Sequence, residues 1–264
     1  MPGVLPTKRA LLVGALFVCL AGNALADCGT PGVGRIWHVQ KVFDGDTVLL
    51  DSGVHLRLIG LDAPEVAHRE QAAQPYAEAA KSALQHLLAG QGWRLRLRYG
   101  REHHDRYGRT LAHAYLPDGT NLSAALLRRG LATALAVPPN VSEAACYQRA
   151  ENMARQHDEG LWSLPRYRPV ASTALPKNAR GFHIVRGRVA HVGFSRRAVW
   201  LDLEGHVAVR IDRRDLGYFR GIDLRGLRGR VITVRGWVHG DHGGTRVSVR
   251  YPLALDLKAG AAAD

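Results

Sequence analysis

The sequence predicts an α+β protein, mainly β, that consists of two small β-barrels with helices packed on the first. Strand-like alternation occurs in both halves of the chain, whereas the two longest helical patterns lie before residue 160. A stretch with three prolines and few apolar residues, 164–181, is typical of a linker. We therefore expect one domain over 27–163, a linker over 164–181 and a second domain over 182–258.

The first half contains five expected strands and three expected helices. The strands are 37–42, 48–50, 55–61, 93–99 and 110–116. The helices are 75–90, 122–130 and 142–160, each of which ends at a glycine. One helix after the third strand and two after the fifth fit a small barrel that is covered by helices.

The second half returns to strand periodicity. The expected strands are 182–189, 198–203, 206–211, 231–238 and 245–249, and short helical or turn structure is expected over 213–228. Three strands, a helical segment and two more strands suggest a second small barrel of the OB-like kind. The Ala- and Gly-rich tail, 259–264, is expected to be disordered.

The N-terminus has the pattern of a secretory signal peptide. Lys8 and Arg9 precede an apolar segment, 10–20, and a small-x-small site follows at 24–26. The apolar segment is too short to span a bilayer, although an uncleaved anchor is the alternative reading. We expect cleavage after residue 26, a secreted or periplasmic mature protein, and no membrane span in it.

Two cysteines, Cys28 and Cys146, remain after removal of the signal segment. Because an exported protein meets an oxidising environment, one disulfide between them is expected. Two free thiols are the alternative.

The net charge of +13 is concentrated in the C-terminal part of the chain. Residues 166–264 contain 19 Lys and Arg against 8 Asp and Glu, whereas residues 27–165 contain 15 of each. A local basic excess indicates a polyanionic partner, which is nucleic acid or an anionic envelope surface. A soluble, arginine-rich surface with no such partner is the third reading.

The stretch 44–65 holds the densest group of candidate site residues. It contains Asp44-Gly45-Asp46-Thr47, Arg57, and Asp62-Ala63-Pro64-Glu65. Each piece alone is a common turn or strand feature. Arg57 and Asp62 fall on opposite faces of a regular strand, but Gly60 and Pro64 permit a bend. Such a bend would gather carboxylates and a guanidinium at the mouth of the barrel, where a metal ion and a phosphodiester could bind together.

With a third motif, Asp105-x-Tyr107-Gly108-Arg109, the chain resembles the staphylococcal nuclease (thermonuclease) family. Matching residues also occur over 121–132 and 160–163, so that the resemblance covers about residues 36–163. It implies an OB-type five-stranded barrel packed by three helices. It also implies an exported, Ca²⁺-dependent nuclease that cleaves DNA and RNA with low sequence specificity and leaves 3′-phosphates.

The resemblance assigns roles to individual residues. The implied metal ligands are the carboxylates of Asp46 and Asp62 and the carbonyl of Ala63. The implied catalytic residues are the general base Glu65 and the phosphate-binding arginines Arg57 and Arg109. Tyr107 and Arg106 are expected to contact substrate. Asp44 and Asp105 are expected to be structural turn residues.

The chain departs from the family pattern in two places. Ala63 stands where the type enzyme has Thr, although a carbonyl ligand requires no particular side chain. The segment 133–140 has no aromatic residue where the type enzyme has tyrosines beside the bound base. Three aromatics of the second half could replace them, although such residues more often belong to the core. They are Trp200, Phe219 and Trp237.

Two other functions use the same features. A non-catalytic nucleic-acid-binding protein would be expected to lose part of the catalytic set, and this chain keeps all of it. An envelope-binding protein would use the basic C-terminal part. If chemistry and polyanion binding are divided between the halves, a truncation near Ser163 is expected to keep a folded, metal-dependent site.

Overall fold

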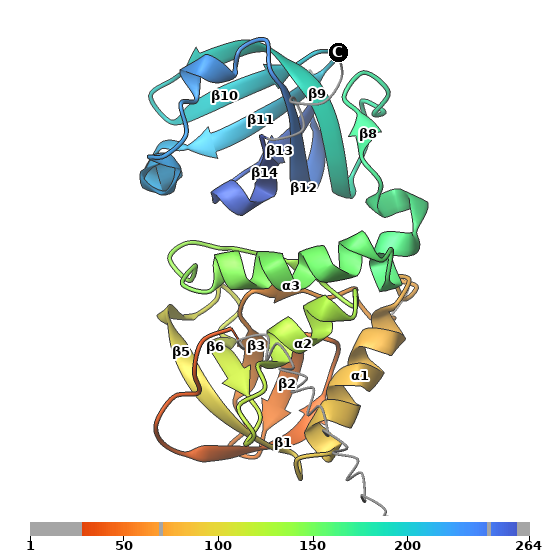
Figure 1. Ribbon diagram of the computed structural model, residues 1–264, viewed down its shortest axis with the longest axis vertical. Coiled ribbons are helices and arrows are strands. Elements are labelled where there is room, and N and C mark those ends of the chain that lie inside the picture. Colours follow the sequence, from red (N-terminus) through yellow and green to blue (C-terminus); the bar gives the residue numbers. More distant parts are fainter. Residues whose placement is uncertain (1–27, 69–70, 242–243, 258–264) are drawn as a thin grey trace, which may run out of the picture.

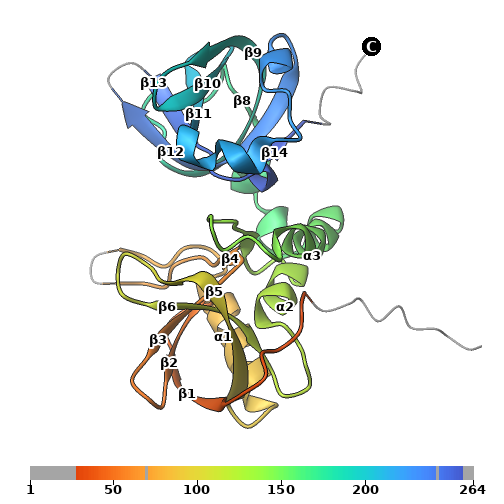
Figure 2. The ribbon, with the colours of Figure 1, turned by 90° about the vertical axis from the view of Figure 1, so that its left-hand side faces the viewer.

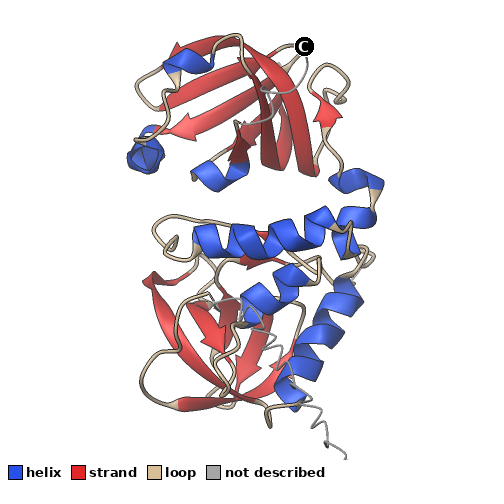
Figure 3. Ribbon diagram, in the orientation of Figure 1, coloured by secondary structure: helices blue, strands red, loops and turns tan. Residues whose placement is uncertain are grey.

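The computed structural model describes residues 28–68, 71–241 and 244–257, which form two β-barrels, one above the other in Figure 1. Helix α3 (Ala144–Gln156) lies between them (Figure 3). The expected signal peptide, 1–26, and the tail, 259–264, lie outside the described residues. Among the residues that are described, none forms a helix with the length and apolar character needed to cross a membrane.

The first barrel is a closed sheet of five strands in the order β1-β2-β3-β6-β5 (Figure 2). The strands are β1 (Ile36–Val42), β2 (Thr47–Leu50), β3 (His55–Leu58), β5 (Arg94–His104) and β6 (Thr110–Tyr115). All neighbours are antiparallel except β3 and β6, which pair in parallel. In β5, Leu95 and Leu97 are buried in the barrel, whereas the arginines between and beside them are more exposed, as alternation requires.

Three helices pack on this barrel. Helix α1 (Ala77–Ala89) buries four residues along one face, and α2 (Leu122–Arg128) begins at Asn121, whose side chain accepts a hydrogen bond of 3.0 Å from the Ala124 N–H. Helix α3 is the third. The prediction of an OB-type five-stranded barrel with three helices is confirmed.

The second barrel repeats the topology of the first. Its strands are β9 (Gly181–Phe194), β10 (Ala198–Leu203), β11 (Val207–Asp212), β12 (Val231–Asp241) and β13 (Gly244–Ser248). Antiparallel pairing of β12 with β9 closes the sheet, and β11 pairs in parallel with β13. The third and fifth strands of both barrels are thus parallel neighbours, and the predicted second OB-like barrel is present.

The segment 164–181 between the barrels has regular structure of its own. It contains the 3₁₀ turn η2 (Pro165–Tyr167) and strand β8 (Val170–Ala171), which pairs in parallel with β9. Tyr167 is buried and its ring meets that of Trp162 edge-on at 5.6 Å. The sheet of the second barrel therefore begins before residue 182.

A buried ion pair joins the two barrels. Arg235 of β12 pairs with Glu151 of α3, and the Glu151 side chain is completely inaccessible to solvent. The same two side chains bind both main-chain groups of Ala134: the Ala134 N–H donates to Glu151 (2.8 Å), and its carbonyl accepts from Arg235 (3.1 Å). The ion pair and these hydrogen bonds therefore connect β12 of the second barrel with α3 and Ala134 of the first.

Cys28 and Cys146 form a disulfide, with their Cα atoms 5.5 Å apart and a sequence separation of 118. The bond ties the first described residue to α3. Tyr115 and Asn121 donate hydrogen bonds of 3.0 and 2.8 Å to the Cys28 carbonyl, so the start of the chain is held beside the core of the first barrel.

Stability is expected to decrease in acid because of His113. Burial lowers the pKa of this imidazole from 6.5 to about 4, and the nearby charge of Arg98 lowers it further in the same direction. Between these values the unfolded chain binds the proton and the folded protein does not, so the free energy of unfolding falls as pH drops from about 6.5 towards 4. The loss should reach at most roughly 3 kcal/mol, and urea unfolding at each pH measures it.

A His113→Asn variant provides the comparison for this prediction. It should be less stable at neutral pH, because His113 Nδ1 lies 2.7 Å from the Tyr147 hydroxyl, but its stability should change less over the same pH interval. An equal acid dependence in both proteins would show that another group is responsible.

Candidate active site at the mouth of the first barrel

Arg57 lies between two carboxylates at one end of the first barrel. Its guanidinium forms an ion pair with Asp46, in the turn before β2, and donates from Nη2 to Oδ1 of Asp62 at 3.0 Å. Asp62 belongs to the short strand β4 (Leu61–Asp62), which pairs with β7 (Thr133–Ala134). The Ala63 N–H donates to Asp46 Oδ2 at 2.9 Å, and thereby ties Ala63 to the same cluster.

A bend at Gly60 brings Arg57 and Asp62 together. Strand β3 ends at Leu58, and Gly60 takes φ +97° before β4 begins. A side chain at this position would clash with the ring of Tyr147, so glycine is required both for its conformation and for the close approach. The bend that the sequence permitted is therefore the feature that assembles the cluster.

The cluster carries more negative charge than Arg57 offsets. Burial and the neighbouring Asp46 raise the pKa of Asp44 to about 7. Burial also raises the pKa of Asp62, although Arg57 opposes the increase. Burial alone would lower the pKa of Arg57, but Asp46 and Asp62 raise it, so the guanidinium stays charged. Such an excess is what a bound cation would relieve.

The oxygen atoms at this position fit a hard cation. Two carboxylates, Asp46 and Asp62, and the main chain at Ala63 lie together, and Ca²⁺ accepts carboxylate, carbonyl and water oxygens. The described residues contain no cluster of three or more His, Cys, Asp or Glu side chains suited to a metal. A cation here would therefore need the carbonyl and water as well as the two side chains. Asp44 accepts from the Asp46 N–H at 2.9 Å, as a turn residue does.

A second guanidinium faces this cluster from the turn before β6. Arg109 donates from Nε to Asp105 at 2.7 Å and from Nη1 to the Thr47 hydroxyl at 3.3 Å. Thr47 in turn donates to Asp46 at 2.9 Å, which links the two sides of the site. Asp105 also accepts from the Tyr107 and Arg109 N–H groups. Burial would raise the pKa of Asp105, but the bond from the Arg109 side chain, followed by these main-chain bonds, lowers it.

Tyr107 and Arg106 lie at the outer edge. The Tyr107 side chain is 67% exposed, and the guanidinium groups of Arg106 and Arg109 lie 4.7 and 5.6 Å from its ring centroid. A cavity of about 440 Å³ is lined by Tyr107, Arg106 and Arg109 together with Arg57. A volume of this size can hold a nucleotide-sized ligand.

Glu65 lies in the exposed loop that follows β4. Gln74 holds this loop, because its N–H donates to the Glu65 carbonyl at 2.9 Å and its side-chain oxygen accepts from the Glu65 N–H at 3.3 Å. The charge of Glu65 acts on both Arg57 and Asp62. The main chain of Glu65 is thus held near the cluster, and the residue remains exposed to solvent.

Two residues of the second barrel reach this site: Trp237, which sequence reasoning named only among three aromatics that could bind a base, and Arg250, which it did not name. Trp237 and Asp62 line one cavity, and the Trp237 side chain lowers the pKa of Asp62 against the effect of burial. Arg250 lines the cavity that contains Arg57 and Arg109, and is held by Asp215 (3.0 Å) and the Pro138 carbonyl (3.3 Å). Of the three aromatics considered from the sequence, Phe219 is core, whereas Trp237 is 49% exposed.

Comparisons with known proteins agree with this geometry. A family model described as "Staphylococcal nuclease homologue" matches residues 55–164. The chain is 36% identical over 132 residues to a thermonuclease of Staphylococcus intermedius, and the match covers 49% of this chain and 77% of that protein. It is 34% identical over 133 residues to a thermonuclease of Staphylococcus hyicus, covering 49% and 76%. An uncharacterized endonuclease of Escherichia coli is 34% identical over 128 residues, covering 47% and 75%.

Proposed function

Because the chain belongs to the staphylococcal nuclease family, whose members hydrolyse nucleic acids, we propose that it is a Ca²⁺-dependent endonuclease that cleaves DNA and RNA with little sequence preference and leaves 3′-phosphates. The observation that carries the proposal is the grouping of Arg57 and Arg109 around one cavity beside the Asp46 and Asp62 carboxylates. A phosphodiester is negatively charged and resists attack, so a catalyst must offset its charge and position water.

Each residue of the site has a distinct part in this proposal. Asp46, Asp62 and the Ala63 carbonyl would hold Ca²⁺, which would offset the charge that develops on the phosphate. Arg57 and Arg109 bind the phosphate oxygens with their planar guanidinium groups. Glu65 orients the attacking water and accepts its proton.

Tyr107 and Arg106 form the outer contact with the substrate in this scheme. Their ring and guanidinium lie together at the edge of the cavity, so they can meet the part of the strand that leaves the cleaved phosphate. Asp105 holds Arg109 in place, and Thr47 joins Arg109 to Asp46.

Export to the periplasm or the medium is part of the proposal. It is supported by the signal-peptide pattern over 1–26 and by the disulfide between Cys28 and Cys146, since such bonds persist in oxidising compartments. A protein that only binds nucleic acid or an anionic envelope would not need the complete set of carboxylates and arginines.

Digestion of circular plasmid, single-stranded DNA and RNA by the mature full chain tests the proposal. We expect cleavage of all three in Ca²⁺. Loss of the closed circle shows cleavage within the strand. Products that polynucleotide kinase labels without phosphatase treatment carry a free 5′-hydroxyl, as 3′-phosphate cleavage requires. Products that are labelled only after phosphatase treatment carry a 5′-phosphate. Binding of all three substrates without cleavage would instead support a non-catalytic protein.

The second barrel is proposed to capture long substrates. Arg196, Arg197, Arg210 and Arg246 surround Trp200 at a hollow of about 450 Å³, which we call the basic hollow. Arg210 lies 5.8 Å from the Trp200 ring, and Arg246 Nε is buried without a hydrogen-bond partner among the described residues. In OB folds the second and third strands and the loop that joins the first two bind oligonucleotides, and the basic hollow occupies this position.

A double variant, Arg196→Ala with Arg197→Ala, should weaken binding of long DNA and RNA and make it less dependent on salt. Each lost phosphate contact removes roughly 0.7–0.9 from the slope of log K against log salt. Cleavage of a dinucleotide should be unchanged, because the basic hollow shares no lining residue with the active-site cavity. An unaltered affinity and slope on long substrates would assign the basic charge to another partner, such as an anionic envelope surface.

A further inference from the structure

The active-site cavity adjoins two further cavities that residues of both barrels line. Leu135, Val137 and Arg250 line both this cavity and a second one of about 180 Å³. The second cavity shares Arg235 and Leu253 with a third of about 560 Å³. We call these three adjoining cavities the interbarrel groove.

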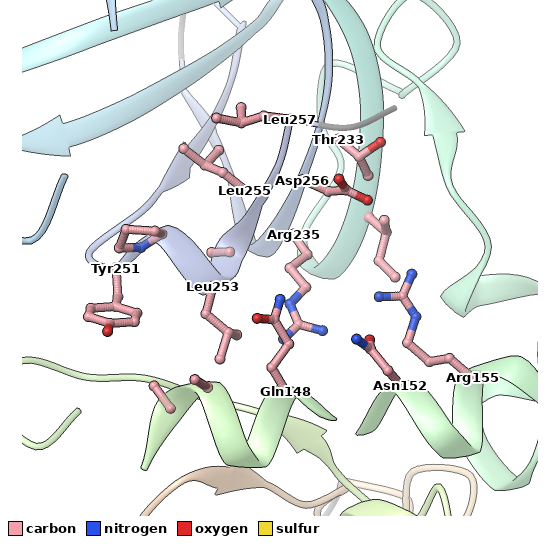
Figure 4. A pocket seen from close by; sticks show the side chains of 15 residues that line it. Gln148, Asn152, Arg155, Thr233, Arg235, Tyr251, Leu253, Leu255, Asp256 and Leu257 are labelled. Carbon is pink, nitrogen blue, oxygen red and sulfur yellow. The ribbon is translucent and has the colours of Figure 1, made fainter. Parts of the chain in front are cut away.

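The far part of the interbarrel groove is polar and is formed by both barrels. Gln148, Asn152 and Arg155 of α3 face Arg235 and Thr233 of β12 across it (Figure 4). Because Arg235 is paired with Glu151, its charge holds the two barrels together.

The part next to the active site is apolar and exposed. Trp237 is 49% exposed, Leu135 38% and Val137 39%, and all three line the 180 Å³ cavity together with Asp62. Apolar side chains that remain open to water beside a reactive site are expected to bind an apolar part of the ligand. In a nucleic acid that part is the face of a base.

Trp237 lies at the boundary of the active site and the groove. It lines the same 180 Å³ cavity as Asp62. The first barrel has no aromatic residue in its own segment beside this cavity, 133–140. The aromatic surface at this position therefore comes from the second barrel.

We propose that Trp237, with Leu135 and Val137, binds the base of a nucleotide next to the bond that is cut, so that the second barrel completes the active site. The inference rests on the proposed nuclease function. A base that is paired inside a duplex cannot enter the groove, so the site is one for an unpaired strand. Trp237 is a substrate-binding residue in this account.

Two probes that differ only in the base test the proposal. They are a nucleoside 3′,5′-bisphosphate and the corresponding abasic sugar bisphosphate, titrated by calorimetry into full-length Glu65→Gln protein at saturating Ca²⁺. This Glu65→Gln protein, the parent of the variants below, should bind the nucleotide more tightly than the abasic probe. Trp237→Ala should lose roughly 5- to 150-fold in nucleotide affinity, the range expected for one stacked base, with little change for the abasic probe.

Two further variants separate stacking from other effects. Trp237→Phe keeps an aromatic ring without the N–H, and should retain most of the preference for the nucleotide. Phe194→Ala removes an exposed aromatic at the opposite end of β9 from the groove, and should change neither affinity.

Equal affinity of the parent for both probes would overturn the proposal. The proposal would also be overturned if Trp237→Ala lost the same affinity for both probes and Trp237→Phe did not restore it. Trp237 would then act only through Asp62. Failure of the proposed function is seen separately, as absence of DNA and RNA cleavage by the wild-type protein.

Discussion

Glu65→Gln should reduce the cleavage rate by roughly 10²- to 10⁴-fold, which is the usual cost of removing a positioned general base. The amide has almost the same shape as the carboxylate but cannot accept the proton of the attacking water. Because the Glu65 main chain holds the loop through Gln74, the substitution should leave the fold unchanged. Initial rates on plasmid and RNA measure the loss, and thermal unfolding followed by circular dichroism checks the fold.

Glu78→Gln is the matched control for this prediction. Glu78 is an exposed carboxylate in the first turn of α1, so its substitution removes the same charge elsewhere on the same barrel. It should leave the rate unchanged. Full activity in Glu65→Gln would remove Glu65 from the mechanism.

Arg235→Met should destabilise the whole chain by about 3–5 kcal/mol, because it leaves the buried carboxylate of Glu151 without its partner. A truncation at Ser163 removes Arg235 together with the barrel that packs against Glu151, so it tests the contact between the barrels rather than this ion pair.

A double-mutant cycle tests this assignment. Glu151→Gln keeps an oxygen that can accept from the Ala134 N–H, so the double variant Glu151→Gln with Arg235→Met should recover part of the stability lost in Arg235→Met alone. Urea unfolding of the four proteins gives the coupling energy. Additive effects would mean that the two side chains do not depend on each other.

The sequence predicted the two barrels and the grouping of the site residues because both depend on local patterns. Strand alternation and helical periodicity mark the elements, and the bend at Gly60 lies within the motif that it assembles. Arg57 reaches Asp62 only five residues away, so the local chain determines their approach.

Contacts between the barrels could not be predicted in this way. Arg235 and Glu151 are 84 residues apart, and each occurs in a segment that resembles an ordinary solvated strand or helix. The same is true of Trp237, whose side chain has no local feature that indicates contact with Asp62. Summed charge placed the basic excess in the second half, but it did not show that one arginine of that excess is buried between the barrels.

The dependence of cleavage on free Ca²⁺, set with EGTA, tests the central claim most directly. Wild-type protein should show no cleavage in excess EGTA and full recovery on addition of Ca²⁺, whereas Mg²⁺ should restore little because it demands tighter octahedral geometry. Asp46→Asn should need a higher Ca²⁺ concentration for half-maximal rate, because one carboxylate ligand is lost. Undiminished cleavage by the wild-type protein in excess EGTA would contradict the assignment of Asp46, Asp62 and Ala63 as a metal site that serves phosphodiester hydrolysis.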